Sequence, residues 1–207
     1  MKHLPEDVLL EIEQVISPED VKQIDGFADH VRTSMPENFE SRIFSDDPKN
    51  GGNNVTYMNQ IFKERIPKIY SNIIELSNEE IVRNKWDPQI KGKLGVRCIE
   101  RLEYNTGSFL DWHEDLDSIY TLILSLSHFG TDYEGGEFKL KLDHSEIVSH
   151  TANLGSGFIF RSECSHAVTP VSKGTRTVLV LEFWEFQDSS RYDLRPGTEY
   201  GVPFETG

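Results

Sequence analysis

The chain of 207 residues contains only two cysteines, Cys98 and Cys164, which excludes a fold built on a framework of disulfides. We interpret both as small buried apolar residues, and a catalytic thiol or a thiolate metal ligand is the less favoured alternative. No apolar run approaches the roughly 18 residues of a membrane span. The first residues, Met1–Asp7, also lack the apolar stretch of a secretory signal. We therefore expect a reducing, cytoplasmic setting and no membrane partner.

Basic residues are also scarce. The chain has 21 Lys and Arg against 35 Asp and Glu, which gives a net charge of −14 and a pI of about 4.9. Proteins that bind nucleic acids need clustered Lys and Arg to follow the phosphates. We therefore expect no nucleic-acid partner, and a nucleic-acid demethylase is disfavoured. The simplest interpretation of the acidic surplus is solubility.

The length and the 37% hydrophobic content fit one globular domain with a sizeable core. The expected order along the chain is a helical N-terminal part at about 1–92, a strand-rich core at about 93–187 and a tail at 188–207. The tail contains aromatic residues, so we expect it to contact the body of the protein. Neither the sequence nor its composition indicates an oligomeric state.

The N-terminal part contains two helical patterns. Ser17–Asp20 reads Ser-Pro-Glu-Asp, which is typical of a helix start, and apolar residues then recur at helical spacing over Ser17–Ser34. A second helix is predicted from Asn54 to about Leu76, with a kink or break at Pro67. The polar, glycine-rich segment Asp46–Asn54 is predicted to be a loop, either a lid over a cleft or a plain surface loop.

From Lys93 onwards the pattern changes to short strands separated by glycine turns. The run Tyr120–Leu126 is almost continuously apolar, as expected for a strand buried on both faces. Short strands at regular spacing indicate a sandwich or a jelly roll. The remaining predicted strands are Val96–Tyr104, Phe138–Leu142, Glu146–Ala152, Gly157–Phe160 and Thr177–Phe186.

The clearest chemical pattern is a His-x-Asp sequence formed by His113 and Asp115. Because successive side chains of a strand alternate between its faces, both can point to one ion from the same side. A later histidine, His166, would complete a set that suits non-haem Fe(II) and leaves positions open for substrate and O2. A His-x-Glu pair also begins at His144, but no His–Arg pair follows it at a suitable spacing. The alternative interpretation is a core histidine that is hydrogen-bonded to a carboxylate.

An arginine follows the second histidine at a spacing that points to an anionic ligand. Arg176 lies ten residues after His166, at the head of the apolar strand Thr177–Phe183. A buried arginine needs an anionic partner, and its planar guanidinium can bind a carboxylate through two parallel hydrogen bonds. We therefore expect Arg176 to bind a carboxylate near the metal.

Together these residues resemble the iron- and 2-oxoglutarate-dependent dioxygenases, and among them the prolyl 4-hydroxylase-like branch. The resemblance covers roughly residues 95–187, and the order and spacing of three blocks agree with the family. These blocks are Tyr104-x-x-Gly107-x-Phe109-x-x-x-His113-x-Asp115, Glu134-Gly135-Gly136-Glu137-Phe138 and His166-x-Val168-x-Pro170-Val171-x-x-Gly174-x-Arg176. The chain departs from the family at Arg176, where collagen-type hydroxylases usually carry Lys, and at Trp112 and Ser125.

The resemblance implies an α+β fold with a double-stranded β-helix (jelly roll) core and N-terminal supporting helices. It also implies Fe(II), 2-oxoglutarate and O2 as cofactors, with ascorbate as an additional reductant. His113, Asp115 and His166 would hold the iron, and Arg176 and Tyr104 would bind the distal carboxylate of 2-oxoglutarate. The candidates for the apolar walls of the cosubstrate pocket are Leu122, Leu124, Val168 and Trp184, and those for substrate contacts are Arg161 and Trp112.

The function implied by this resemblance is hydroxylation of an unactivated C–H bond with release of succinate and CO2. The expected substrate is a prolyl residue of a peptide or protein, and a free amino acid or another small molecule is an alternative. Related halogenases lack the carboxylate ligand, so Asp115 favours hydroxylation. A non-catalytic, cupin-like jelly roll that binds metal or a small ligand stays open as a different class, although it has no need of Arg176.

Overall fold

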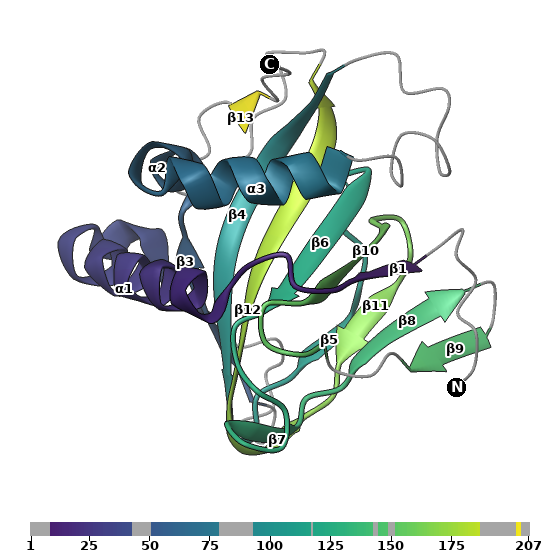
Figure 1. Cartoon of the computed structure of the whole chain (residues 1–207). Helices are drawn as coiled ribbons and strands as arrows, with labels where there is room; N and C mark the ends of the chain where they lie inside the picture. The colour runs from purple at the N-terminus through teal and green to yellow at the C-terminus, as the bar shows by residue number, and fades with distance from the viewer. Residues whose placement is uncertain are drawn as a thin grey trace.

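The computed structural model describes residues 9–42, 51–78, 93–116, 118–142, 145–148, 152–186 and 202–203. Within these ranges the chain forms two antiparallel sheets, one of nine strands and one of four. The helices lie along one face of the larger sheet, and the smaller sheet lies against its other face (Figure 1). This arrangement confirms the predicted double-stranded β-helix core with N-terminal supporting helices.

The larger sheet has the longest strands at its centre, where β12 and β4 pair in antiparallel register. Two short strands pair beside the main path, β13 (Val202–Pro203) with β4 and β7 (Tyr133–Gly135) with β12. The spatial order of its main path is β1 (Leu9–Ile12), β10 (Gly157–Arg161), β6 (Tyr120–Ser125), β12 (Val171–Phe186), β4 (Lys93–Asn105), β3 (Asn53–Tyr57) and β2 (Phe39–Arg42). The order in the smaller sheet is β5 (Leu110–His113), β11 (His166–Val168), β8 (Phe138–Leu142) and β9 (Ser145–Val148).

The first helix forms as its sequence predicts. α1 (Pro18–Ser34) begins at Ser17, whose hydroxyl accepts from the backbone N–H of Asp20, and the Asp20 carboxylate accepts from the backbone N–H of Ser17. This reciprocal pair satisfies two backbone donors that the first helical turn leaves without partners. A short 3-10 helix, η1 (Pro36–Asn38), then leads into β2.

The second predicted helix is partly wrong. Its break at Pro67 is confirmed, because α2 (Asn59–Arg65) ends before this proline and α3 (Pro67–Asn78) begins with it. Asn53–Tyr57, however, forms strand β3, so the predicted helix start and the end of the predicted loop Asp46–Asn54 are both incorrect. The reason is tertiary, since pairing with β2 and β4 suits the β-branched and aromatic residues Val55–Tyr57. Positions 46–50 of that loop lie outside the described residues.

Most strand predictions after Lys93 agree with the structure, and the differences lie at the ends. β8 matches its predicted range, whereas β12 begins at Val171, six residues before the predicted start. β13 brings the tail segment Val202–Pro203 into register with Val96 and Gly95 of β4. The expected contact between the tail and the body is therefore present at these two residues.

Strand β6 is buried on both faces, as its continuous apolar run predicts. Leu122 and Leu124 pack into the core cluster that includes the helices, together with residues such as Ile24 and Phe62. Ile123 faces the other way, into the cluster between the two sheets. One strand therefore contributes to two cores, and its odd-numbered positions face the space between the sheets.

We predict that Leu124→Ala lowers the free energy of unfolding by about 2–5 kcal/mol, because it removes a fully buried side chain from the core beneath the helices. Urea denaturation monitored by circular dichroism measures this change. The exposed Leu116→Ala is the matched control and should alter stability by less than about 0.5 kcal/mol. Equal stability of the two variants would contradict this assignment of Leu124.

Candidate active site

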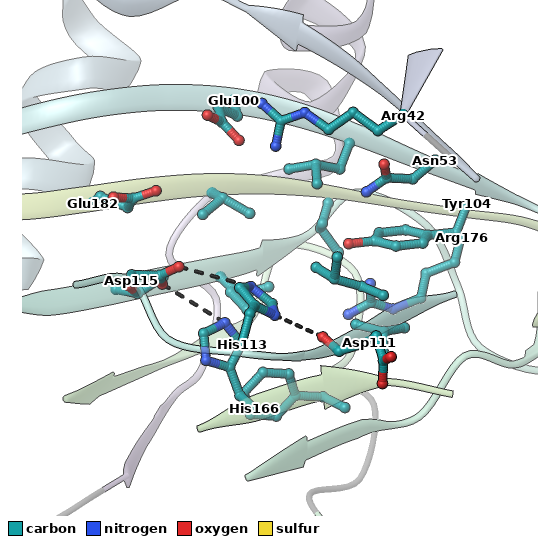
Figure 2. A pocket seen from close by; sticks show the side chains of 18 of the residues that line it. Arg42, Asn53, Glu100, Tyr104, Asp111, His113, Asp115, His166, Arg176 and Glu182 are labelled. Atoms are coloured by element: carbon teal, nitrogen blue, oxygen red, sulfur yellow. Dashed lines mark hydrogen bonds and ion pairs between the residues drawn. The ribbon is translucent and has the colours of Figure 1, made fainter. Parts of the chain in front are cut away.

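Three potential metal ligands meet where strand β5 ends beside β11. The pairing register places His113 opposite His166, and Asp115 lies two residues beyond His113. The Asp115 carboxylate is 3.7 Å from Nε2 of His113 through Oδ1 and 3.7 Å from Nε2 of His166 through Oδ2. One ligand atom from each residue lies within 4.8 Å of the others, which is a spacing that one metal ion can bridge (Figure 2).

Backbone carbonyls orient both imidazoles. Nδ1 of His113 donates to the carbonyl of Asp111 at 2.9 Å, and Nδ1 of His166 donates to the carbonyl of Cys164 at 3.0 Å. This arrangement leaves each Nε2 with its lone pair directed toward Asp115. Burial lowers the pKa of His113 and lowers that of His166 to about 3. Both rings are therefore neutral near pH 7, as metal ligation requires.

Hydrogen bonds with neighbouring residues also restrain the Asp115 carboxylate. The Thr121 hydroxyl donates to its Oδ2 at 2.6 Å and contacts the Ser162 hydroxyl at 2.9 Å. The backbone N–H of Asp115 donates to the carbonyl of Ser162 at 2.9 Å. Thr121 and Ser162 are both buried, so these contacts are shielded from water and restrict rotation of the carboxylate.

A cavity of about 410 Å³ extends from these three residues between the two sheets. Its apolar lining includes Leu102, Ile123, Phe138 and Val178. This volume is in the usual range for small-molecule and cofactor sites, which are mostly apolar with a few polar groups. The cavity is therefore large enough for a small cosubstrate together with part of a substrate.

Arg176 also lines this cavity. It is 4% exposed, and its Nε and Nη1 atoms have no hydrogen-bond partner among the described residues. The residue opposite it in the register is Tyr104, and the Arg176 guanidinium carbon is 5.2 Å from the centre of the Tyr104 ring. Burial raises the pKa of Tyr104, although the nearby charge of Arg176 opposes this rise. The Tyr104 hydroxyl therefore stays protonated and can donate a hydrogen bond.

The glycine pair in the turn after β7 makes room for this arginine. A Cβ atom at Gly136 would lie 2.9 Å from Cδ of Arg176 and 3.0 Å from Val171. Gly136 also has a φ of +62°, which is a conformation that other residues rarely adopt. The motif glycine thus allows Arg176 to extend into the cavity. A buried guanidinium with unpartnered nitrogens fits a carboxylate such as the distal one of 2-oxoglutarate.

The structure corrects three of the candidates for the pocket wall. Leu122 and Leu124 do not line the cavity, because the alternation along β6 turns them toward the helices. Trp184 is buried on β12 but is also absent from the lining, since it lies one pleat beyond the lining residue Glu182. Val168 does line the cavity.

The two candidates for substrate contacts differ in position. Trp112 lines the cavity and is 40% exposed, so it lies at the mouth. Its ring is also 5.4 Å from the Nζ atom of Lys141. Arg161 does not line the cavity and forms an ion pair with Glu163 at 3.7 Å. A direct substrate contact by Arg161 is therefore not supported.

Several polar lining residues were missed by the sequence reasoning. Arg42 and Asn53 come from β2 and β3, which lie outside the recognised motifs, and Glu100 and Glu182 lie on the two central strands. Glu100 could have been found, because it lies four residues before Tyr104 on the same strand and so shares its face. Asn53 had no such signal, since β3 was not recognised as a strand.

The comparisons with known proteins agree with this geometry. Residues 99–184 match the family model described as the 2OG-Fe(II) oxygenase superfamily. Among curated proteins, no sequence matches significantly.

Solved structures show the same fold at low sequence identity. A Pseudomonas putida prolyl-4-hydroxylase has 15% identity and a TM-score of 0.61, covering 86% of this chain and 93% of its own. A Trichoplax adhaerens prolyl hydroxylase, in complex with a peptide fragment of the hypoxia inducible factor oxygen degradation domain, has 14% identity and a TM-score of 0.64, covering 86% and 84%. The epimerase SnoN from nogalamycin biosynthesis has 12% identity and a TM-score of 0.68, covering 97% and 91%.

The matched segment 99–184 includes all three motif blocks and, with them, the lining residues His113, Asp115, His166 and Arg176. Motif spacing, fold and family model agree, so residues 99–184 of this chain are similar to the 2OG-Fe(II) oxygenase superfamily.

Proposed function

We propose that this protein is a 2-oxoglutarate-dependent dioxygenase in which His113, Asp115 and His166 hold Fe(II). The observation that carries the proposal is the convergence of two neutral imidazoles and one carboxylate in the lining of a cavity that also contains a buried arginine. Two histidines and one carboxylate on one face leave other coordination positions open. When bound there, iron and 2-oxoglutarate supply the oxidative chemistry that activates O2.

The remaining roles follow from the cavity. Arg176 binds the distal carboxylate of 2-oxoglutarate through its planar guanidinium, and Tyr104 donates its hydroxyl to the same group. These contacts orient the cosubstrate so that its 2-oxo acid end points to the metal ligands. The apolar wall around Val168 limits the access of water. Ascorbate, as an additional reductant, belongs to the same proposal.

The proposed substrate is a prolyl residue of a peptide or protein. Fold similarity to two prolyl hydroxylases supports it, one of them in complex with a peptide, and Trp112 offers an exposed aromatic surface at the mouth of the cavity. In the reaction, O2 contributes one oxygen atom to the hydroxylated product and one to succinate, and 2-oxoglutarate loses CO2. The carboxylate of Asp115 occupies the third ligand position, which favours hydroxylation.

A free amino acid or another small polar molecule is the second candidate. The observation that favours it is the charged wall of the cavity, where Arg42, Glu100 and Glu182 all contribute to the lining. Such groups suit a substrate with its own charges more than an uncharged prolyl ring. A non-catalytic jelly roll is disfavoured, because it would gain nothing from a buried, unpartnered guanidinium at Arg176.

We predict that Thr121→Val weakens Fe(II) binding roughly 10- to 100-fold, because Asp115 loses the hydrogen bond that orients its carboxylate. Anaerobic competition with a chelator measures the affinity. Thr33→Val is the matched control, since the Thr33 hydroxyl only bonds to backbone carbonyls within α1, and it should bind iron like the wild type. Unchanged affinity in Thr121→Val would remove Thr121 from this role.

We also predict that Arg176→Ala weakens 2-oxoglutarate binding by at least about a hundredfold, because loss of one member of a buried charge pair costs about 3–5 kcal/mol. Tyr104→Phe should cost less, about 1–2 kcal/mol for one hydrogen bond to a charged group. Calorimetric titration of the metal-loaded, oxygen-free protein measures both changes. Arg161→Ala should keep the wild-type affinity, and an unchanged affinity in Arg176→Ala would place the carboxylate elsewhere.

The substrate is tested with paired peptides that differ only in Pro or Ala at the target position, together with a panel of free amino acids. We expect a prolyl peptide to gain one oxygen in mass spectrometry and to stimulate succinate formation. Under 18-O2, label should enter both the product and succinate. Turnover of free amino acids alone would favour the second candidate, and the absence of any coupled substrate would contradict the hydroxylase proposal.

A further inference from the structure

Asn53 is a buried polar residue whose amide lies beside the Tyr104 hydroxyl. It is 2% exposed and lines the cavity from the first position of β3. Neither its Nδ2 nor its Oδ1 atom has a hydrogen-bond partner among the described residues. Burying an amide without a partner costs free energy, and an apolar side chain at this position would avoid that cost.

The other buried asparagines of the described chain are satisfied by backbone groups. Nδ2 of Asn38 donates to the carbonyl of Tyr57 at 3.1 Å, and Oδ1 of Asn59 accepts from the backbone N–H of Ile99 at 2.7 Å. Asn38 therefore satisfies the carbonyl at the end of β3, and Asn59 satisfies an N–H in the middle of β4. Asn53 differs from them because its amide bonds to no backbone group and lies beside the Tyr104 hydroxyl in the lining of the cavity.

The pairing register places Asn53 beside the residues proposed to bind the cosubstrate. On one side, Asn53 pairs with Arg42 of β2. On the other side, Asn54 pairs with Glu103 of β4, so Asn53 lies beside the next residue of that strand, Tyr104. Tyr104 in turn lies opposite Arg176 of β12. Side chains in one such row share a face and have Cβ atoms about 4.5–5.5 Å apart. In Figure 2 Asn53 and Arg176 lie on opposite sides of the Tyr104 ring.

The start of β3 is held by the same turn that follows Tyr104. Gly51 forms a parallel bridge with Ser108, and a Cβ atom on Gly51 would collide with the carbonyl of Gly107. The backbone N–H of Gly107 donates to the carbonyl of Val171 at 2.8 Å, which ties this turn to β12. Asn53 is therefore placed by backbone contacts, independently of any ligand, as a preorganised binding group needs to be.

The number of available donors fits a carboxylate. A carboxylate can accept about four hydrogen bonds. Arg176 offers two unpartnered nitrogens, Nε and Nη1. The Tyr104 hydroxyl, which lies beside Asn53 and Arg176, is a further donor. Nδ2 of Asn53 is an unpartnered donor from the third neighbouring strand. We propose that Asn53 is a specificity-determining residue that donates its amide to the distal carboxylate of 2-oxoglutarate, an inference that rests on the proposed function.

The test compares two 2-oxo acids of equal chain length. 2-Oxopentanoate carries a methyl group in place of the distal carboxylate of 2-oxoglutarate. Both are titrated into Mn(II)-loaded, oxygen-free protein by calorimetry, so that binding is measured without turnover. Asn53→Ala should weaken binding of 2-oxoglutarate about tenfold or more, the effect of one hydrogen bond to a charged group. Binding of 2-oxopentanoate should stay within about twofold, because that ligand has no group for the amide to bind.

A second variant tests whether the Asn53 side chain acts as a hydrogen-bond donor to the carboxylate. Asn53→Asp keeps the shape of the side chain but replaces the donor with a carboxylate, so it should weaken 2-oxoglutarate binding more than Asn53→Ala does. If Asn53→Ala folds poorly, this near-isosteric variant still tests the proposal. Binding of 2-oxoglutarate to Asn53→Asp as tight as in the wild type would overturn it.

Asn38→Ala is the matched control. It should lower the free energy of unfolding, because the carbonyl of Tyr57 loses its side-chain donor, and it should leave 2-oxoglutarate affinity unchanged. Asn53→Ala should show the opposite behaviour, with stability retained and affinity lost. Equal weakening of both 2-oxo acids, or unchanged 2-oxoglutarate affinity, would overturn the role of Asn53. Failure of the wild type to bind 2-oxoglutarate, or insensitivity to Arg176→Ala, would instead contradict the proposed function itself.

Discussion

The antiparallel ladder between β4 and β12 is the constraint on which the rest of this structure depends. It runs from the pair of Asn105 and Thr175 to that of Lys93 and Phe186, at the centre of the larger sheet. Because side chains alternate along both strands, one set faces the helices and the other faces the cavity. The same ladder that builds the supporting core therefore also places Arg176 opposite Tyr104 and defines one wall of the site.

The metal-binding end depends on a second pairing, that of β5 with β11 in the smaller sheet. This pair is short and irregular, and its register shifts between His166 and Val168. The geometry of the ligands is consequently maintained by contacts outside the ladder, from backbone carbonyls to both imidazoles and from Thr121 to Asp115. Burial keeps the rings neutral, and the hydroxyl restrains the carboxylate, so three potential ligands from a loop and two short strands lie at a spacing that could hold one ion.

Buried charges in the cavity differ in how they are compensated. Glu182 accepts from Arg97 and from the Ser118 hydroxyl at 2.6 Å, and Arg42 contacts the Tyr57 hydroxyl. These groups are satisfied within the protein and can shape a polar substrate region. Arg176 and Asn53, in contrast, have buried atoms without protein partners. In the proposed function, a bound carboxylate would offset the free-energy cost of leaving them so.

The sequence by itself determined the features that depend on neighbours in the chain. The capping box of Ser17 and the break at Pro67 follow from local rules, and the spacing of the His-x-Asp pair, His166 and Arg176 indicated the chemistry. Tertiary structure decided the rest. The residues of β3 form a strand only because β2 and β4 pair with them, which is why Asn53 could not be recognised. The sequence also could not show that Ile123, rather than Leu122 and Leu124, faces the cavity. A strand such as β6 that is buried on both faces has no polar side from which its orientation can be predicted.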